Sequence, residues 1–192
     1  LIFKTAMNTR KPFGSLNSPE HKAAAREIAR EGIVLLKNEG AAPLLPIDAS
    51  LYRNVLVVGE NAVRPLCPGG GSSELKAQDE VSPLRGIKER FGKDWSITYA
   101  AGYKGGASSY GGIEKISQQV EDSLYEDAVA KAQNADLIIY IGGLNKSHFQ
   151  DCEGGDRLGF ALPFGQDRLI AALAKSGKKM VTVITSGNAV SM

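Results

Sequence analysis

The sequence predicts an α/β fold, in which a mainly parallel sheet is sandwiched between helices on both faces in Rossmann-like αβα layers. Helical periodicity fills the intervals between four predicted strands, of which the second alternates apolar and polar residues and the other three are mainly apolar runs. Strands that alternate with helices of about ten or more residues specify right-handed βαβ units. The first run is apolar on both faces, as a central parallel strand should be. The four predicted strands are residues 54–59, 95–100, 136–141 and 179–185.

The chain begins with a segment that we interpret as a linker. Residues 1–18 combine proline, glycine and scattered basic residues without helical or strand periodicity. A helix start follows, with Ser18 as N-cap, Pro19 at the first helical position and Glu20 in the first turn. The pattern predicts a helix to about residue 33, followed by short extended pieces on either side of a turn at Gly40.

The remaining elements follow the four strands in order. A glycine-rich segment, residues 67–73, comes after the first strand, and residues 102–112 form a loop rich in Gly, Ser and Tyr. We expect the third strand to end in a turn at Gly142 and Gly143. The turn after the fourth strand would normally lead into another helix, so we expect residues 19–192 to be one α/β domain truncated at its C-terminal end. The predicted helices of this part are residues 82–91, 120–133 and 166–175.

Composition excludes several classes of partner. Charges nearly cancel at +2 over 192 residues, and no basic cluster is interleaved with aromatics, so nucleic acid is not expected as a partner. No apolar run approaches the roughly 20 residues of a membrane span. The two cysteines, Cys67 and Cys152, and the two histidines lack metal-ligand spacing. We therefore expect two unpaired thiols, no metal and no cofactor.

Three kinds of active site lack their sequence patterns. A dinucleotide-binding site has its glycines in a tight turn directly after the first strand, whereas the glycine-rich segment here begins about ten residues beyond that strand. No Gly-Lys-Ser/Thr follows the segment, as a P-loop would require. The Gly-x-Ser-x-Gly elbow of a serine hydrolase is absent. His148 lies near Asp151 and Cys152, but no third group is identifiable that would orient a triad.

The remaining candidates for catalytic groups are the carboxylates in the loop of residues 150–157, which follows the third strand. Ligands gather beyond the carboxyl ends of strands in open α/β sheets. Glu153 is followed by two glycines, and Asp156 and Arg157 can form a local ion pair. Enclosure by Phe149 or by an apolar leaving group would raise the pKa of Glu153 toward that of a general acid in glycoside hydrolysis. Asp151 and Asp156 remain alternatives.

Several motifs occur in a fixed order along nearly the whole chain, from Glu20-His21 onwards. They are residues 26–39 (Arg-Glu-Ile-Ala-Arg-Glu-Gly-Ile-Val-Leu-Leu-Lys-Asn-Glu), 43–46 (Pro-Leu-Leu-Pro), 57–59 (Val-Val-Gly), 69–73 (Gly-Gly-Gly-Ser-Ser), 153–157 (Glu-Gly-Gly-Asp-Arg) and 162–163 (Leu-Pro) with Gln166. Together these motifs resemble the second domain of glycoside hydrolase family 3, particularly its β-glucosidases.

The resemblance implies a retaining β-glycosidase that acts on terminal β-linked sugars. Family members pair a (β/α)8 barrel, which supplies a nucleophilic aspartate, with an α/β sandwich that supplies the acid/base glutamate, and Glu153 matches that glutamate. Ser72, His148 and Phe149 are then expected to contact the substrate, a β-linked glucoside or oligosaccharide. Residues 1–18 become an interdomain linker.

The same resemblance implies that the barrel is a partner domain absent from this chain. The chain alone should therefore be inactive. A periplasmic or secreted parent protein is also implied. The alternative is a non-catalytic module that contacts carbohydrate or serves a structural role.

Overall fold

A computed structural model describes Lys4 and residues 14–64, 66, 72, 75–106, 108–109, 112–145, 157 and 159–191. The chain divides into two compact units, Leu1–Gly40 and Ala41–Met192. The first unit contains helix α2 (Pro19–Glu31), whose N-cap Ser18 accepts a hydrogen bond from the backbone N–H of His21 at 3.3 Å. The helix start predicted at Ser18 is confirmed.

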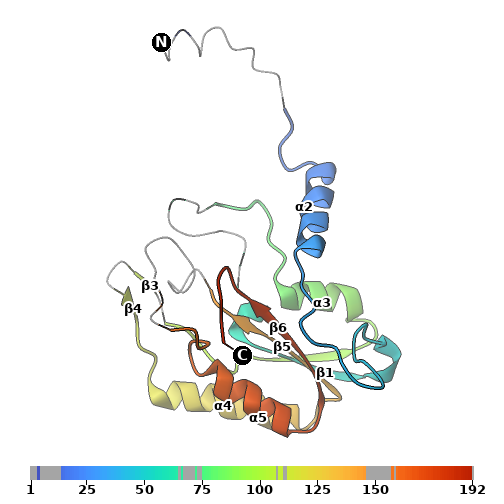
Figure 1. The fold of residues 1–192 in the computed structure, drawn as a ribbon, viewed down its shortest axis with the longest axis vertical. Coiled ribbons are helices and arrows are strands. Elements are labelled where there is room, and N and C mark those ends of the chain that lie inside the picture. The colour runs from blue at the N-terminus through green and yellow to red at the C-terminus, as the bar shows by residue number, and fades with distance from the viewer. Residues whose placement is uncertain are drawn as a thin grey trace. The chain divides into compact units, whose positions relative to one another are not determined.

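The second unit contains the sheet and its covering helices (Figure 1). Every predicted helix and strand of this part is present, with ends shifted by no more than two residues. The elements are η1 (Ala49–Leu51), β1 (Asn54–Val58), η2 (Glu60–Ala62), α3 (Pro83–Phe91), β2 (Ser96–Ala100), β3 (Ser108–Ser109), β4 (Gly112–Ile113), α4 (Gln118–Ala132), β5 (Leu137–Gly143), α5 (Gln166–Lys175) and β6 (Lys179–Thr185), where η1 and η2 are 3-10 helices.

Four parallel strands form the main sheet in the order β2-β1-β5-β6. Val55 pairs with Ile97 of β2 on one side and with Leu137 of β5 on the other, so β1 is an interior strand. This position explains why β1 is apolar on both faces. The predicted parallel α/β fold is confirmed.

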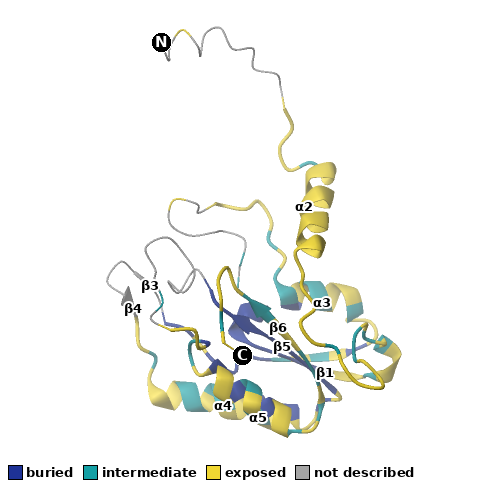
Figure 2. Cartoon of the chain, viewed as in Figure 1, coloured by how far each residue is buried: buried dark blue, intermediate teal, exposed yellow. Residues whose placement is uncertain are grey.

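Helices cover both faces of the sheet (Figure 1). On one face Leu56 and Ile138 pack among Ala128 and Ala132 of α4 and the leucines of α5. On the other face the alternate strand residues pack against α3 and the segment around η1. Figure 2 shows the buried strands between the partly exposed helices. The fully buried strand side chains are Val55, Leu56, Val57, Val58, Leu137, Ile138 and Tyr140.

Two local predictions differ from the structure. Gly142 and Gly143 belong to β5, because they pair in register with Ile184 and Thr185 of β6. The sequence suggested a turn there, since glycine signals a turn locally while strand pairing depends on residues some forty positions away. The predicted loop at residues 102–112 contains strand β3 and the start of β4, which form an antiparallel hairpin too short for a periodic signal.

Asp136 joins the starts of β1 and β5 at the amino edge of the sheet. Its carboxylate accepts the backbone N–H of Asn54 at 2.8 Å and of Arg53 at 3.1 Å. These two hydrogen bonds hold the pKa of Asp136 below its ordinary value. The folded pKa is therefore below the unfolded one, so the stabilisation is present above about pH 3.9 and is lost as the pH falls through the folded pKa.

We predict that Asp136→Asn makes stability less sensitive to acid. Asparagine keeps one oxygen acceptor but does not titrate, so the free energy of unfolding should fall less between pH 5 and pH 2.5 than in the wild type. Urea unfolding at these pH values measures the difference. Glu126→Gln on the exposed side of α4 is the control and should follow the wild type. If the free energy of unfolding fell by the same amount between pH 5 and pH 2.5 in the wild type and in Asp136→Asn, the prediction would be wrong.

Candidate functional site

The carboxyl ends of the four parallel strands meet at one edge of the sheet, and we describe this carboxyl edge as the candidate site. Helix η2 follows β1 there, residues 101–106 follow β2, and Leu144 and Asn145 follow β5. Residues 186–191 follow β6 at the same edge. Ligands of open parallel sheets bind beyond this edge, so side chains that order these segments define the frame of the site.

Asn61 joins the ends of β5 and β6 to η2. Its Nδ2 donates to the carbonyl oxygen of Leu144 at 3.2 Å and to Oγ1 of Thr185 at 3.0 Å, and its Oδ1 accepts from Nδ2 of Asn145 at 3.1 Å. The Thr185 hydroxyl in turn donates a hydrogen bond to the carbonyl oxygen of Gly142 at 3.0 Å. Both amide side chains are buried and satisfied, which makes such a network rigid.

Gln166, the first residue of α5, is hydrogen-bonded to the end of β5. Its Oε1 accepts from the backbone N–H of Gly143 and from the hydroxyl of Tyr140, both at 2.8 Å, and its Nε2 donates to the Gly143 carbonyl at 2.9 Å. Gln166 is fully buried. Burial raises the pKa of the Tyr140 phenol, which keeps it a hydrogen-bond donor. A Cβ on Gly142 would lie 2.4 Å from Oε1, so glycine is needed at that position.

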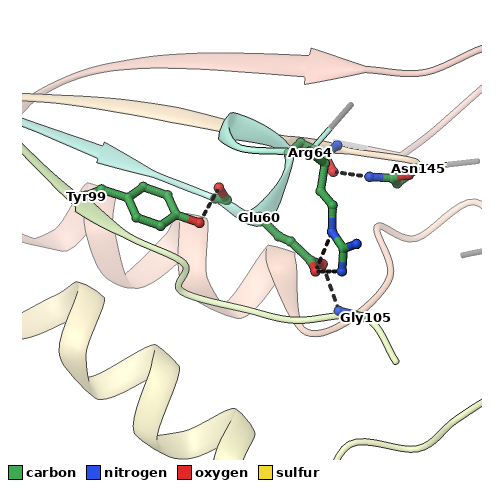
Figure 3. Close-up of polar contacts among 7 residues, drawn as sticks. Glu60, Arg64, Tyr99, Gly105 and Asn145 are labelled. Atoms are coloured by element: carbon green, nitrogen blue, oxygen red, sulfur yellow. Dashed lines mark hydrogen bonds and ion pairs between the residues drawn. The ribbon is translucent and has the colours of Figure 1, made fainter. Parts of the chain in front are cut away.

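Glu60 and Arg64 form an ion pair at the end of β1 (Figure 3). Glu60 Oε1 accepts from Nε and Nη2 of Arg64 at 3.0 and 2.6 Å, and Oε2 accepts from the backbone N–H of Gly105 at 2.8 Å. The Tyr99 hydroxyl donates to the Gly59 carbonyl at 3.4 Å. Burial, and then the negative charge of Glu60, raise the pKa of Tyr99 to about 12.

Asn145 and Arg157 are described and lie on either side of residues 146–156 in the sequence. Asn145 is hydrogen-bonded to Asn61. Arg157, the last residue of the acidic loop, donates from Nη2 to Oδ1 of Asn188, at 2.5 Å, and to the carbonyl oxygen of Ala189. Its Nε and Nη1 are buried and make no hydrogen bond within the described part of the chain. Asn145 is therefore held by η2, and Arg157 by the segment after β6.

Most of the side chains predicted from sequence to act in the site lie outside the described residues. This is true of Glu153, His148 and Phe149, and of the alternatives Asp151 and Asp156. Cys67 and Cys152, which were expected to be unpaired thiols, also lie outside the described residues. Ser72 is described and is exposed. Among described residues, no three His, Cys, Asp or Glu side chains gather as a metal site, and no helix has the length and apolar character to cross a membrane.

Sequence reasoning missed the residues that frame the site. Glu60 and Asn61 belong to none of the motifs identified in the sequence, and Gln166 was expected only as the first residue of a helix and part of a motif. Apart from the Glu60–Arg64 pair, which is four positions apart, their partners lie 23 to 124 positions away in sequence. One local signal was available, namely a charged residue and an amide residue just after a buried strand. If such residues are themselves buried, they must find hydrogen-bond partners.

The fold defines an α/β domain with a parallel sheet, in which the candidate site is built from segments that follow the strands. Residues 33–192 match the glycosyl hydrolase family 3 C-terminal domain. The chain belongs to this family.

Three relatives illustrate the similarity. Beta-glucosidase BoGH3A of Bacteroides ovatus is 57% identical over all of this chain and 26% of its own length. A periplasmic beta-glucosidase of Salmonella typhimurium is 32% identical over 87% of this chain and 22% of its own length. The solved b-glucosidase EmGH1 of Erythrobacter marinus is 32% identical, with a TM-score of 0.72 over 90% of this chain and 24% of that one. The chain thus spans about a quarter of the length of these relatives.

Proposed function

We propose that the chain is the acid/base domain of a retaining β-glycosidase of the β-glucosidase type. In this proposal Glu153 is the general acid and then the general base, while an aspartate of a barrel domain in the same protein is the nucleophile. The observation that carries it is the family membership of residues 33–192. It is supported by the sequence position of Glu153 between Asn145 and Arg157, two residues that lie at the carboxyl edge.

The proposed reaction needs two carboxyl groups about 5 to 5.5 Å apart. Glu153 protonates the oxygen of the leaving group while the aspartate attacks the anomeric carbon. The resulting carboxylate of Glu153 then removes a proton from the water that releases the sugar. The described residues contribute position, since the hydrogen bonds of Asn145 and Arg157 hold the chain on either side of residues 146–156.

The substrate we propose is a terminal β-linked glucoside or oligosaccharide. Its support is the name of the 57% identical relative, a β-glucosidase. Ser72, His148 and Phe149 are the proposed substrate contacts on this domain. We place the enzyme in the periplasm or outside the cell, because one relative is named a periplasmic β-glucosidase.

Hydrolysis of an aryl β-glucoside by the chain joined to its barrel, and by the chain alone, tests the proposal. We expect turnover only with the barrel present, because the nucleophile lies there. Proton NMR of the first product should show the β-anomer of glucose, since two displacements retain configuration. The α-anomer as first product, or equal turnover by the chain alone, would contradict the proposed mechanism.

A further inference from the structure

Glu60 carries a buried carboxylate that has no role in the proposed reaction. The residue is 5% exposed and follows Gly59, just beyond the end of β1 at Val58. A charge in such a place is unfavourable unless it is paired and hydrogen-bonded. Its partners therefore indicate what the carboxylate contributes.

The carboxylate of Glu60 connects two different segments of the carboxyl edge (Figure 3). One oxygen takes both hydrogen bonds from Arg64, which lies just past η2, and the other takes the backbone N–H of Gly105, 45 positions from Glu60 in sequence. Charge-assisted hydrogen bonds of this kind are short and directional. Glu60 thus fixes the distance between the chain leaving β1 and the chain leaving β2.

The connection extends beyond Gly105 to the hairpin of β3 and β4. A Cβ placed on Gly106 would lie 1.8 Å from the carbonyl oxygen of Glu114, so the chain returning from β4 lies directly against Gly106. Holding Gly105 therefore holds both sides of the hairpin's base. Glu60, Arg64 and Gly105 together are called the edge brace below.

We propose that the edge brace is a positioning device for the leaving group, with Glu60 as its central residue. The inference rests on the proposed function. If the acid is on the loop after β5, it protonates the oxygen that joins sugar and leaving group. Strand β1 is the neighbour of β5, and β2 is the next strand, so both segments that the brace fixes lie at the carboxyl edge on the β1 side of β5. In this proposal they border the leaving group, while the barrel holds the sugar being cleaved.

Replacement of Arg64 in the two-domain enzyme tests the proposal without emptying a buried position, because the Arg64 side chain is 35% exposed. We expect Arg64→Met to raise KM for a β-linked disaccharide by about tenfold, because the leaving-group surface is no longer fixed. KM and kcat for β-glucosyl fluoride, whose leaving group is a single atom, should stay within about twofold of wild type. Arg64→Lys should recover part of the loss.

The matched control is Arg85→Met, which removes an arginine with two ion pairs on exposed α3. It should leave both substrates unchanged. Hydrogen exchange gives a readout independent of turnover: in Glu60→Gln, amides of residues 101–106 should exchange faster, while those of β5 keep wild-type rates. Glutamine keeps one acceptor oxygen but places an N–H donor where the second oxygen accepted.

The outcomes separate this proposal from the function on which it rests. Equal losses on disaccharide and fluoride in Arg64→Met, or unchanged exchange in Glu60→Gln, would overturn the positioning role while leaving the glycosidase assignment intact. Absence of turnover of either substrate by the wild-type two-domain enzyme would instead reject the proposed function, and the leaving-group role with it.

Discussion

Glu153→Ala in the two-domain enzyme is expected to slow hydrolysis of an unactivated β-glucoside by about 10²- to 10⁴-fold, the usual contribution of a general acid. The loss should be smaller for formation of the glycosyl-enzyme from an aryl glucoside whose leaving group needs no proton. Azide should then accelerate turnover, because a small anion can enter the space of the missing carboxylate and attack without a base. The product should be the β-glucosyl azide, with retained configuration.

The pH profile provides a second measurement on the same variant. A general acid must be protonated, so kcat/KM of the wild type should fall on the alkaline side, and this limb should disappear in Glu153→Ala with an aryl glucoside. Asp151→Asn and Asp156→Asn are the controls and should show no azide acceleration. Unchanged turnover of Glu153→Ala without azide would exclude Glu153 as the acid/base and direct the search to Asp151, Asp156 or another loop.

Gln166→Ala is expected to give the largest loss of stability of any single change considered. It leaves the N–H and carbonyl of Gly143 and the hydroxyl of Tyr140 without their buried partner, and it leaves a cavity at the start of α5. Each unsatisfied group costs about 1–3 kcal/mol, with partial relief from relaxation, so we expect a total of about 3–5 kcal/mol. The melting temperature should fall by about 10 °C.

Gln118→Ala is the matched control, because Gln118 begins α4 as Gln166 begins α5 but is exposed. It should change stability by less than about 0.5 kcal/mol. Urea unfolding measures both variants. A loss below about 1 kcal/mol for Gln166→Ala would show that water replaces the lost bonds.

Gln166→Glu tests the same network through pH. Only a protonated carboxyl at position 166 can donate to the Gly143 carbonyl, and burial also disfavours the charged form, so the folded pKa should lie above the unfolded value of about 4.3. The stability of this variant should therefore be greatest below about pH 4.3 and be lost as the pH rises through the folded pKa. If the difference in free energy of unfolding between Gln166→Glu and the wild type did not change with pH, this prediction would be wrong.

The strands and helices could be predicted because their signals are local. The apolar run that became β1 and the Ser18-Pro19 helix start each carry their information within a few residues. Gly143 shows the limit, because its membership of β5 depends on Thr185, which no local pattern reveals. The β3–β4 hairpin shows another, since two-residue strands have no period to detect.

The candidate site was predicted less completely than the fold. Physical reasoning located an acidic loop after a buried strand, and the motif at residues 153–157 singled out Glu153; its role remains a prediction. Most contacts of the supporting residues could not be predicted because they are long-range hydrogen bonds; the Glu60–Arg64 ion pair, four positions apart, is the exception. Asn61 and Glu60 bind partners more than forty positions away, so only the folded chain brings these contacts into view.

The turn at residues 176–178, before β6, has a practical consequence for protein engineering. It lies at the amino edge of the sheet, at the opposite end of β6 from the carboxyl edge. Gly177 there has a positive φ and open space around it. We expect a fluorescent reporter or an attachment point for immobilisation to be tolerated in this turn, because added sequence would project away from the candidate site.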